Sequence, residues 1–401
     1  MPHSKNVKLD TVCPMVWDHL CINTAGKNRL CCNSKTQDND YFQTNFDNHW
    51  NQFRENIKKE MLQGGRPDVC SSCWKKEDAG ITSLRQAIIR TYQSRKEWEN
   101  FLNRLDLSRE FPVELDLKLG NYCNLACRMC NSYSSSKNAT ELKKIWNDTG
   151  IDIGVDDYEK YYVQKKWYLE ESFIESINKM ITNGLRDLKF TGGEPLMVPG
   201  VKKIIEFCIN SGYADNIYLT LITNVTLIDQ EWVNKLKKFK FVNIICSIDG
   251  TGKTYEYIRD LASWKDVNTR LNLLFNTATA NMRIDITFTL QIYNMLEIES
   301  MVNLSKNYNC KITAIVLDTP SYLDVRNAPE KLKLDALTCV DKLFFNTNNS
   351  EKIKEFLKNI KNAINRPATE DTIEKFKTIT LLKDRYKNQN STKMKFWKYY
   401  S

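Results

Sequence analysis

Histidine is scarce in this chain: three of its 401 residues are histidines, and none follows residue 49. A Ser-His-Asp or Cys-His catalytic apparatus and a zinc site of the H-E-x-x-H type are therefore excluded from most of the chain. No run of about 18 or more apolar residues occurs, so we expect no membrane span. The opening residues, MPHSKNVKLD, have no apolar core of the kind that a secretory signal needs, and we therefore expect a cytoplasmic protein.

Cysteine, by contrast, is abundant, with 13 residues. Disulfides do not persist in a reducing compartment, so clustered cysteines there indicate ligands of a metal or cluster, or catalytic groups. Nine of the 13 cysteines fall into two groups. Isolated cysteines in apolar runs are typical of buried structural thiols. We expect this of the remaining four, Cys208, Cys246, Cys310 and Cys339.

From residue 113 onward, strand-like and helix-like segments alternate. The expected strands are 113–119, 187–191, 216–223, 241–248, 282–290 and 310–317, and the expected helices are 171–183, 201–210, 229–239, 265–279 and 295–307. This alternation predicts right-handed βαβ units and a parallel sheet. Six strands are too few to close an eight-stranded barrel, so we expect an open, partial (β/α)6 barrel of the α/β class.

The first four of these strands each end in a distinctive motif, at the end where parallel α/β folds gather their functional residues. In chain order the motifs are CNLACRMC (123–130), TGGEP (191–195), ITNVT (222–226) and SIDGTG (247–252). Three thiolates on one loop can hold three irons of a [4Fe–4S] cluster and leave one iron open. A structural zinc site is a poor alternative, because the next cysteine after this loop is Cys208.

The cysteine loop followed by GGEP resembles the radical S-adenosylmethionine (SAM) superfamily, over roughly residues 112–320. The resemblance implies a [4Fe–4S] cluster held by Cys123, Cys127 and Cys130. In that family the cluster binds SAM through its open iron and cleaves it reductively to methionine and a 5′-deoxyadenosyl radical, which abstracts hydrogen from the substrate. The resemblance also implies an electron donor such as flavodoxin or ferredoxin.

The same resemblance implies the contacts to SAM. The GGEP loop matches the loop that holds the methionine amino group, and its glycines suit a backbone that approaches the ligand closely. Met129 stands where an aromatic residue is common, and a methionine can still pack against adenine. Arg259 matches a position whose guanidinium pairs with the SAM carboxylate, with a surface salt bridge as the alternative. The expected contacts are Gly192, Gly193, Glu194, Pro195, Asn224, Ser247 and Arg259, of which Asn224 and Ser247 match positions that contact the ribose or carboxylate.

The second cysteine group lies in residues 1–82. The segment WDHLCINTAGKNRLCCN predicts two short strands about a glycine-containing turn. The C-x12-G-x4-C spacing and the later C-x2-C are similar to the twitch module, a shorter relative of the SPASM domain. The resemblance implies a second, auxiliary [4Fe–4S] cluster, and a four-cysteine zinc site is the alternative. The implied ligands are Cys13, Cys31, Cys70 and Cys73.

Two features of this group are unusual. Such modules usually follow the barrel, whereas here the module precedes it, as in a group of radical SAM proteins with an N-terminal twitch domain. Cys31 and Cys32 are adjacent, and adjacent residues of a regular strand face opposite sides. We therefore expect only one of them to be a ligand, and the family spacing favours Cys31. Cys21 and Cys32 are then expected to pack away from the cluster.

The predicted organisation has four parts. They are a twitch-like domain at 1–83, a helical linker at 84–110, the partial barrel at 111–322 and a basic, mostly helical extension at 323–401. Residues 351–401 contain 13 Lys and Arg against 6 Asp and Glu, which indicates either a nucleic-acid partner or a solvated helical tail. We expect the final stretch, QNSTKMKFWKYYS, to be loosely packed.

Relatives with twitch or SPASM modules often modify peptides or proteins. We therefore expect a radical SAM oxidoreductase or maturase that oxidises or cross-links a peptide or protein side chain, with the auxiliary cluster as electron conduit. The alternatives are dehydrogenation of a small metabolite and modification of a nucleic acid. A non-catalytic iron–sulfur or zinc scaffold is disfavoured by the GGEP loop, because a scaffold needs no site for an amino group.

Overall fold

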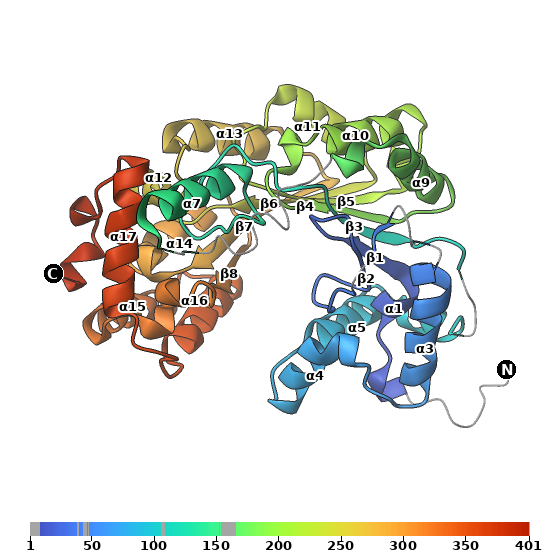
Figure 1. Ribbon diagram of the computed structural model, residues 1–401, viewed down its shortest axis with the longest axis horizontal. Helices are drawn as coiled ribbons and strands as arrows, with labels where there is room; N and C mark the ends of the chain where they lie inside the picture. Colours follow the sequence, from blue (N-terminus) through green and yellow to red (C-terminus); the bar gives the residue numbers. More distant parts are fainter. Residues whose placement is uncertain are drawn as a thin grey trace. The chain divides into compact units, whose positions relative to one another are not determined.

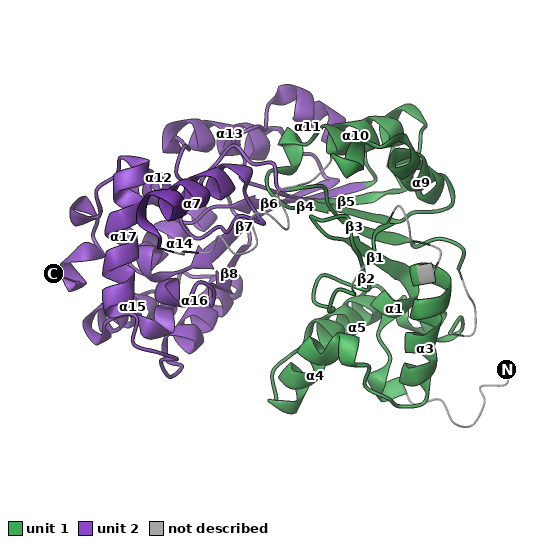
Figure 2. Ribbon diagram, in the orientation of Figure 1, with its two compact units in different colours: residues 1–120, 164–220, 238–240 green, residues 121–163, 221–237, 241–401 purple. Residues whose placement is uncertain are grey.

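The computed structural model describes residues 9–37, 40–42, 46, 48–105, 109–151, 153 and 166–400. The chain divides into two compact units (Figure 2). Unit 1 contains Met1–Gly120, Gln164–Thr220 and Lys238–Lys240, and unit 2 contains Asn121–Val163, Leu221–Lys237 and Phe241–Ser401. The predicted four-part organisation follows other boundaries and stays a prediction. Within the described ranges, no helix is long and apolar enough to cross a membrane.

The strands form one eight-stranded sheet in the order β2-β1-β3-β4-β5-β6-β7-β8 (Figure 1). Pairing is parallel between β1 and β3, β3 and β4, β6 and β7, and β7 and β8, and antiparallel between β1 and β2. The predicted α/β class with its partial barrel is confirmed, and each predicted strand lies within two residues of an observed one. The bounds are β1 (His19–Ile22), β2 (Asn28–Arg29), β3 (Glu114–Lys118), β4 (Asp187–Thr191), β5 (Tyr218–Thr223), β6 (Phe241–Ser247), β7 (Met282–Leu290) and β8 (Ile312–Val316).

Burial alternates along the central strands because successive side chains point to opposite faces. In β4, β5 and β6 every second residue is buried and the residues between are half-buried. The fully buried residues are apolar, such as Phe190, Leu221 and Ile244. One face of the sheet is thus covered completely and the other only partly, as expected for an open barrel.

In unit 1, the predicted hairpin is present, but it is not a separate sheet. Cys21 on β1 lies in parallel register with Asp116 on β3, so the hairpin extends the main sheet at its edge. The predicted helix at 84–105 is two helices, α5 and α6. Ser83 starts α5, because its hydroxyl accepts a hydrogen bond from the Gln86 N–H while the Gln86 side chain accepts from the Ser83 N–H. The helices of unit 1 are α1 (Pro14–Asp18), α3 (Arg54–Leu62), α4 (Ser71–Asp78), α5 (Leu84–Ser94), α6 (Trp98–Leu102), α9 (Glu171–Thr182) and α10 (Pro199–Asn210).

In unit 2, three helices follow the last strand, as predicted for the C-terminal extension. The expectation of a loose final stretch is wrong. Phe396 and Tyr400 are 2% and 4% exposed, and the ring of Tyr400 stacks on Phe376 with centroids 4.2 Å apart. Aromatic packing therefore anchors the end of the chain. The helices of unit 2 are α7 (Ser136–Thr149), α11 (Gln230–Leu236), α12 (Gly252–Ile258), α13 (Trp264–Thr277), α14 (Ile298–Asn307), α15 (Glu330–Phe344), α16 (Glu351–Ile364) and α17 (Ile373–Lys387).

Candidate active site

The three cysteines of the C-x3-C-x2-C motif lie on an irregular loop of unit 2. Cys123 and Cys127 are buried and Cys130 is half-buried, and the three side chains pack into one small cluster. A hydrogen bond from the Cys130 thiol is the main cause that lowers the pKa of Cys127, and the positive charge of Arg259 adds to this effect. The loop therefore brings three cysteine side chains together beside a cation. The thiolate form is favoured at Cys127, whereas the same hydrogen bond raises the pKa of Cys130.

The backbone of this loop is fixed by the segment that ends α12. The N–H of Ala126 donates to the carbonyl oxygen of Asp260 at 3.2 Å, and the N–H of Arg128 donates to that of Ile258 at 2.9 Å. These two donors flank Cys127. The ligand loop and the Arg259 segment are thus joined directly, although they are far apart in the sequence.

Asn224, in the ITNVT motif after β5, contacts the cysteine loop. Its side-chain amide donates to Asn124 Oδ1 at 3.0 Å and lies 3.9 Å from Cys123 Sγ. Its own carbonyl oxygen accepts a hydrogen bond from the Thr226 N–H at 2.9 Å, and Asn124 donates to the Thr226 hydroxyl at 2.8 Å. Asn224 therefore positions the loop, whatever it contributes to a ligand. Neither Asn124 nor Thr226 was predicted as a site residue, although they stand inside the CNLACRMC and ITNVT motifs.

Arg259 follows α12 and is buried, with its Nη2 2.7 Å from Oδ2 of Asp249. The alternative of a surface salt bridge is therefore wrong: the two side chains are 7% and 0% exposed. Burial alone would lower the pKa of Arg259, but the surrounding negative groups, of which Asp249 contributes most, together raise it. Asp249 also accepts a hydrogen bond from the Thr289 N–H at 2.7 Å. Asp249 lies in the SIDGTG motif, yet it was not predicted as a site residue.

Arg259 also retains a donor that could serve a ligand. Its Nε is buried and has no hydrogen-bond partner within the described part of the chain. A buried guanidinium N–H without a partner is costly unless something accepts from it. A carboxylate is a suitable acceptor, because it can take a charge-assisted hydrogen bond from this group.

Ser247, the last residue of β6, is half-buried.

The GGEP loop begins directly after β4 in unit 1. Gly192 has φ +124°, and a Cβ added there would lie 3.2 Å from the carbonyl oxygen of Gly120, so the backbone requires glycine. Glu194 is fully buried, and its carboxylate accepts a hydrogen bond from the Leu196 N–H at 3.3 Å. The close approach at Gly192 and the hydrogen bond of Glu194 thus fix the backbone of this loop. Of its other two residues, Gly193 is half-buried and Pro195 is buried. The predicted contacts of its four residues with SAM stay predictions.

Four cysteines of unit 1 line a single cavity: Cys13, Cys31, Cys70 and Cys73. Burial is the main cause that raises the pKa of Cys13, Cys31 and Cys70, to about 11 for Cys31 and about 12 for Cys70. A metal or cluster that binds here must therefore displace protons. In the described residues, no three His, Cys, Asp or Glu side chains are grouped closely enough to hold a single metal ion.

Cys31 and Cys32 do not lie on a strand. β2 ends at Arg29, and both cysteines follow it in a bend and turn, so the strand argument for choosing between them was wrong in its premise. Cys31 lines the cavity, whereas Cys32 is not among its lining residues. Of the four isolated cysteines, Cys208 and Cys246 are buried as predicted, whereas Cys310 and Cys339 are half-buried.

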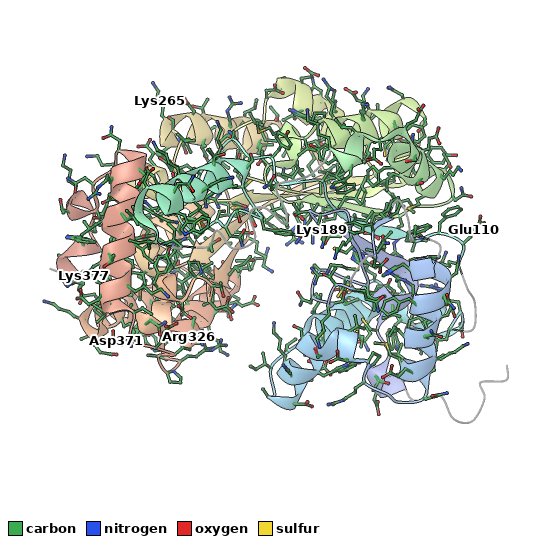
Figure 3. The ribbon with its side chains drawn as sticks, viewed as in Figure 1. Glu110, Lys189, Lys265, Arg326, Asp371 and Lys377 are labelled. Carbon is green, nitrogen blue, oxygen red and sulfur yellow. The ribbon has the colours of Figure 1, made fainter. Side chains whose placement is uncertain are left out.

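Cys21 lies on a polar face of the sheet in unit 1. It stands in register with Asp116, and Asp116 in turn with Lys189, which is labelled in Figure 3. The ammonium group of Lys189 pairs with the Asp116 carboxylate at 2.8 Å. Burial raises the pKa of the Cys21 thiol. His19, two residues earlier on the same face, is also buried, and burial lowers its pKa to about 3. Both side chains are therefore neutral near pH 7.

The chain resembles known proteins over part of its length. The model of the radical SAM superfamily matches residues 117–305. The chain is 23% identical over 234 residues to the sporulation killing factor maturation protein SkfB of Bacillus subtilis (strain 168), covering 57% of this chain and 47% of that protein. It is 29% identical over 138 residues to the uncharacterized protein MJ0907 of Methanocaldococcus jannaschii, covering 34% and 38%. The chain thus spans less than half the length of these curated relatives.

Two solved structures are similar in part. The structure of anSMEcpe with bound AdoMet aligns with a TM-score of 0.40 and 19% identity, over 58% of this chain and 60% of that chain. Streptococcus suis SuiB bound to S-adenosylmethionine aligns with a TM-score of 0.36 and 15% identity, over 72% and 63%. The family match covers the cysteine loop, the GGEP loop, Asn224 and Arg259. Residues 117–305 therefore form a domain of the radical SAM superfamily.

Proposed function

We propose that this protein is a radical SAM oxidoreductase that oxidises or cross-links a side chain of a peptide or protein. The observation that carries the proposal is the cluster of Cys123, Cys127 and Cys130 beside the buried Arg259. Three sulfur donors suit a [4Fe–4S] cluster with one open iron. A buried guanidinium N–H without a partner suits the carboxylate of SAM.

Each residue has a distinct task in this proposal. The three cysteines hold the cluster, and Asn224 and Asn124 fix the loop that presents them. Asp249 holds the Arg259 guanidinium so that its Nε faces a ligand carboxylate. A reduced [4Fe–4S] cluster held by these cysteines would supply the one electron that reductive cleavage of SAM requires. We expect the GGEP backbone to receive the SAM amino group.

The substrate class is supported by one relative and one cavity. SkfB is a maturation protein of a killing factor, which favours a peptide or protein as substrate here. Removing a hydrogen atom from a side chain leaves a radical, and a second electron must leave before an oxidised product forms. The cavity lined by Cys13, Cys31, Cys70 and Cys73 would hold an auxiliary cluster, whose chemistry there would be electron transfer.

The basic C-terminal segment gives less support to the alternative of a nucleic-acid substrate than its sequence suggests. It rested on the positive charge of residues 351–401, yet the side chains of Lys383 and Lys387 are buried. Cations that face the interior of a protein do not contact phosphates. The solvated-tail interpretation of this segment is wrong for the same two residues.

The test begins with anaerobic reconstitution of the full chain with iron and sulfide. The reduced protein should convert SAM to 5′-deoxyadenosine, and Cys127→Ala should abolish this conversion. Cys208→Ala is the matched control, because Cys208 is a buried cysteine of unit 1 that belongs to neither cysteine group. Conversion that persists in Cys127→Ala would refute the site.

The substrate class needs its own measurement. Short peptides encoded beside the gene should be co-expressed with the protein and examined by mass spectrometry. Oxidation or cross-linking should remove two hydrogen atoms from one of them, and Cys127→Ala should leave its mass unchanged. SAM turnover stimulated by a small metabolite instead, with no change in any peptide, would favour the metabolite alternative.

A further inference from the structure

The last long helix, α17, contacts both the cysteine loop and the segment around Arg259. Lys383 and Lys387 are four residues apart, so they lie on one face of this helix. Both side chains are buried, at 2% and 0% exposed. Lys383 Nζ donates to the carbonyl oxygen of Arg128 at 2.8 Å, and Lys387 Nζ donates to that of Ala126 at 2.7 Å.

These two hydrogen bonds complete the backbone around Cys127. The N–H groups of Ala126 and Arg128 donate to Asp260 and Ile258, as described above. The backbone N–H and C=O groups of Ala126 and Arg128 therefore all have a hydrogen-bond partner. The two neighbours of Cys127 are thus held through their N–H groups by residues 258 and 260 and through their carbonyl oxygens by the lysines of α17.

The side chain of Arg128 is tied to the same helix. It is fully buried, forms an ion pair with Asp384 and lies over the ring of Tyr257 at 3.8 Å. Asp384 accepts a further hydrogen bond from the Tyr257 hydroxyl at 2.9 Å. Gln389, just after α17, accepts from Arg128 Nε at 3.0 Å. α17 therefore contacts both the main chain and a side chain of the cysteine loop.

Lys387 also brings positive charge close to Cys127, because its Nζ bonds to the carbonyl oxygen of the preceding residue, Ala126. Lys387 is balanced by two carboxylates, Glu141 at 2.6 Å and Asp260 at 3.3 Å. A cation near an iron–sulfur cluster favours the reduced state, because that state carries more negative charge.

We propose that Lys383 and Lys387 are positioning residues of the radical SAM site: both fix the backbone beside Cys127, and the charge of Lys387 raises the reduction potential of the cluster. This inference rests on the proposed function, since it needs a cluster on Cys123, Cys127 and Cys130. It extends the site beyond the matched residues 117–305 to α17.

The test compares Lys387→Met and Lys383→Met with a control on the same helix, Lys375→Met, whose side chain is exposed. Methionine retains most of the length and loses the charge. The measurements are iron content after anaerobic reconstitution and an electron paramagnetic resonance redox titration of the cluster that responds to SAM. We expect both variants to bind less iron, and we expect the reduction equilibrium of Lys387→Met to fall about tenfold, which is 59 mV for one electron. Lys375→Met should match the wild type.

The wild type separates failure of the inference from failure of the proposed function. If the wild type shows no SAM-responsive cluster, the proposed function fails. If it shows one and both lysine variants match it in iron content and potential, the inference alone fails. If Lys387→Met does not fold, the iron content of Lys383→Met decides the inference. In that variant Glu141 and Asp260 keep Lys387 as their ion-pair partner.

A double variant separates charge from position. Lys387→Met with Glu141→Gln removes one charge of each sign, whereas the hydrogen bond to Ala126 stays lost. The potential should return toward the wild-type value while the iron content stays low. A potential that stays at the Lys387→Met value would overturn the effect assigned to charge.

Discussion

Arg259 and Asp249 form a buried ion pair, with 2.7 Å between Nη2 and Oδ2. Asp249→Asn should leave the guanidinium buried without its counterion, which costs about 3–5 kcal/mol. The denaturant midpoint of the full chain should fall accordingly. Glu231→Gln is the control, because Glu231 pairs with Lys235 but is 71% exposed, and a surface pair contributes at most about 1 kcal/mol. Equal midpoints for the two variants would contradict this account.

Iron content tests the two cysteine groups together. Reconstituted wild type should hold about eight irons per chain, from two four-iron clusters. Replacing Cys123, Cys127 and Cys130 together with alanine should leave about four. Iron and zinc analysis of both proteins provides the measurement. If the wild type never exceeds about four irons, the cavity of unit 1 is not a cluster site, and zinc bound there would support the alternative.

Gly192→Ala tests whether the GGEP loop requires glycine for its backbone. Gly192 combines φ +124° with a close approach to Gly120 O, whereas Gly184 has φ +93° and open space around it. Gly184→Ala should therefore cost only backbone strain, about 1 kcal/mol. Gly192→Ala should cost more, about 2–3 kcal/mol, because a neighbour must also move. Urea unfolding of both variants gives the comparison, and equal losses would mean that the close approach is unimportant.

His19 makes stability depend on pH. Its pKa is about 3 in the folded protein, against 6.5 for an unburied histidine, because burial disfavours the charged form. As pH falls below about 6.5, the unfolded chain binds a proton that the folded chain does not, so stability falls until about pH 3. The loss at about pH 5 should be about 2 kcal/mol relative to neutral pH. Urea midpoints at both values should differ less in His19→Gln, and an unchanged difference would show that another group is responsible.

The strands and their terminal motifs could be predicted from the sequence because both are local features. Alternating burial within β4 to β6 follows directly from alternating apolar residues, and each motif starts where its strand ends. The pairing of β1 with β3 could not be predicted in the same way. It joins Cys21 to Asp116, and no local pattern specifies a partner so far along the chain.

The site residues that could not be predicted from the sequence were missed for one physical reason. Lys383 and Lys387 fit the periodicity of a charged helix face, and only the fold reveals that this face is buried against backbone carbonyls. Asp249 stood in a recognised motif, but its role depends on Arg259, which follows one helix later. Cys31 was chosen by spacing, and β2 proved too short for the strand argument to apply. Side chains that act on main-chain groups leave little trace in a single sequence.

The auxiliary cysteines can be tested separately from SAM cleavage. Cys70→Ala with Cys73→Ala removes two of the four thiols that line the cavity of unit 1, and it should remove about four irons. SAM cleavage should persist, because Cys123, Cys127 and Cys130 lie in the other unit. Formation of the oxidised product should stop, because the substrate radical then lacks its electron acceptor. Circular-dichroism melting must first show an intact fold, since metal binding also contributes to stability. A folded double variant that forms product at the wild-type rate would leave the cavity with a structural role only.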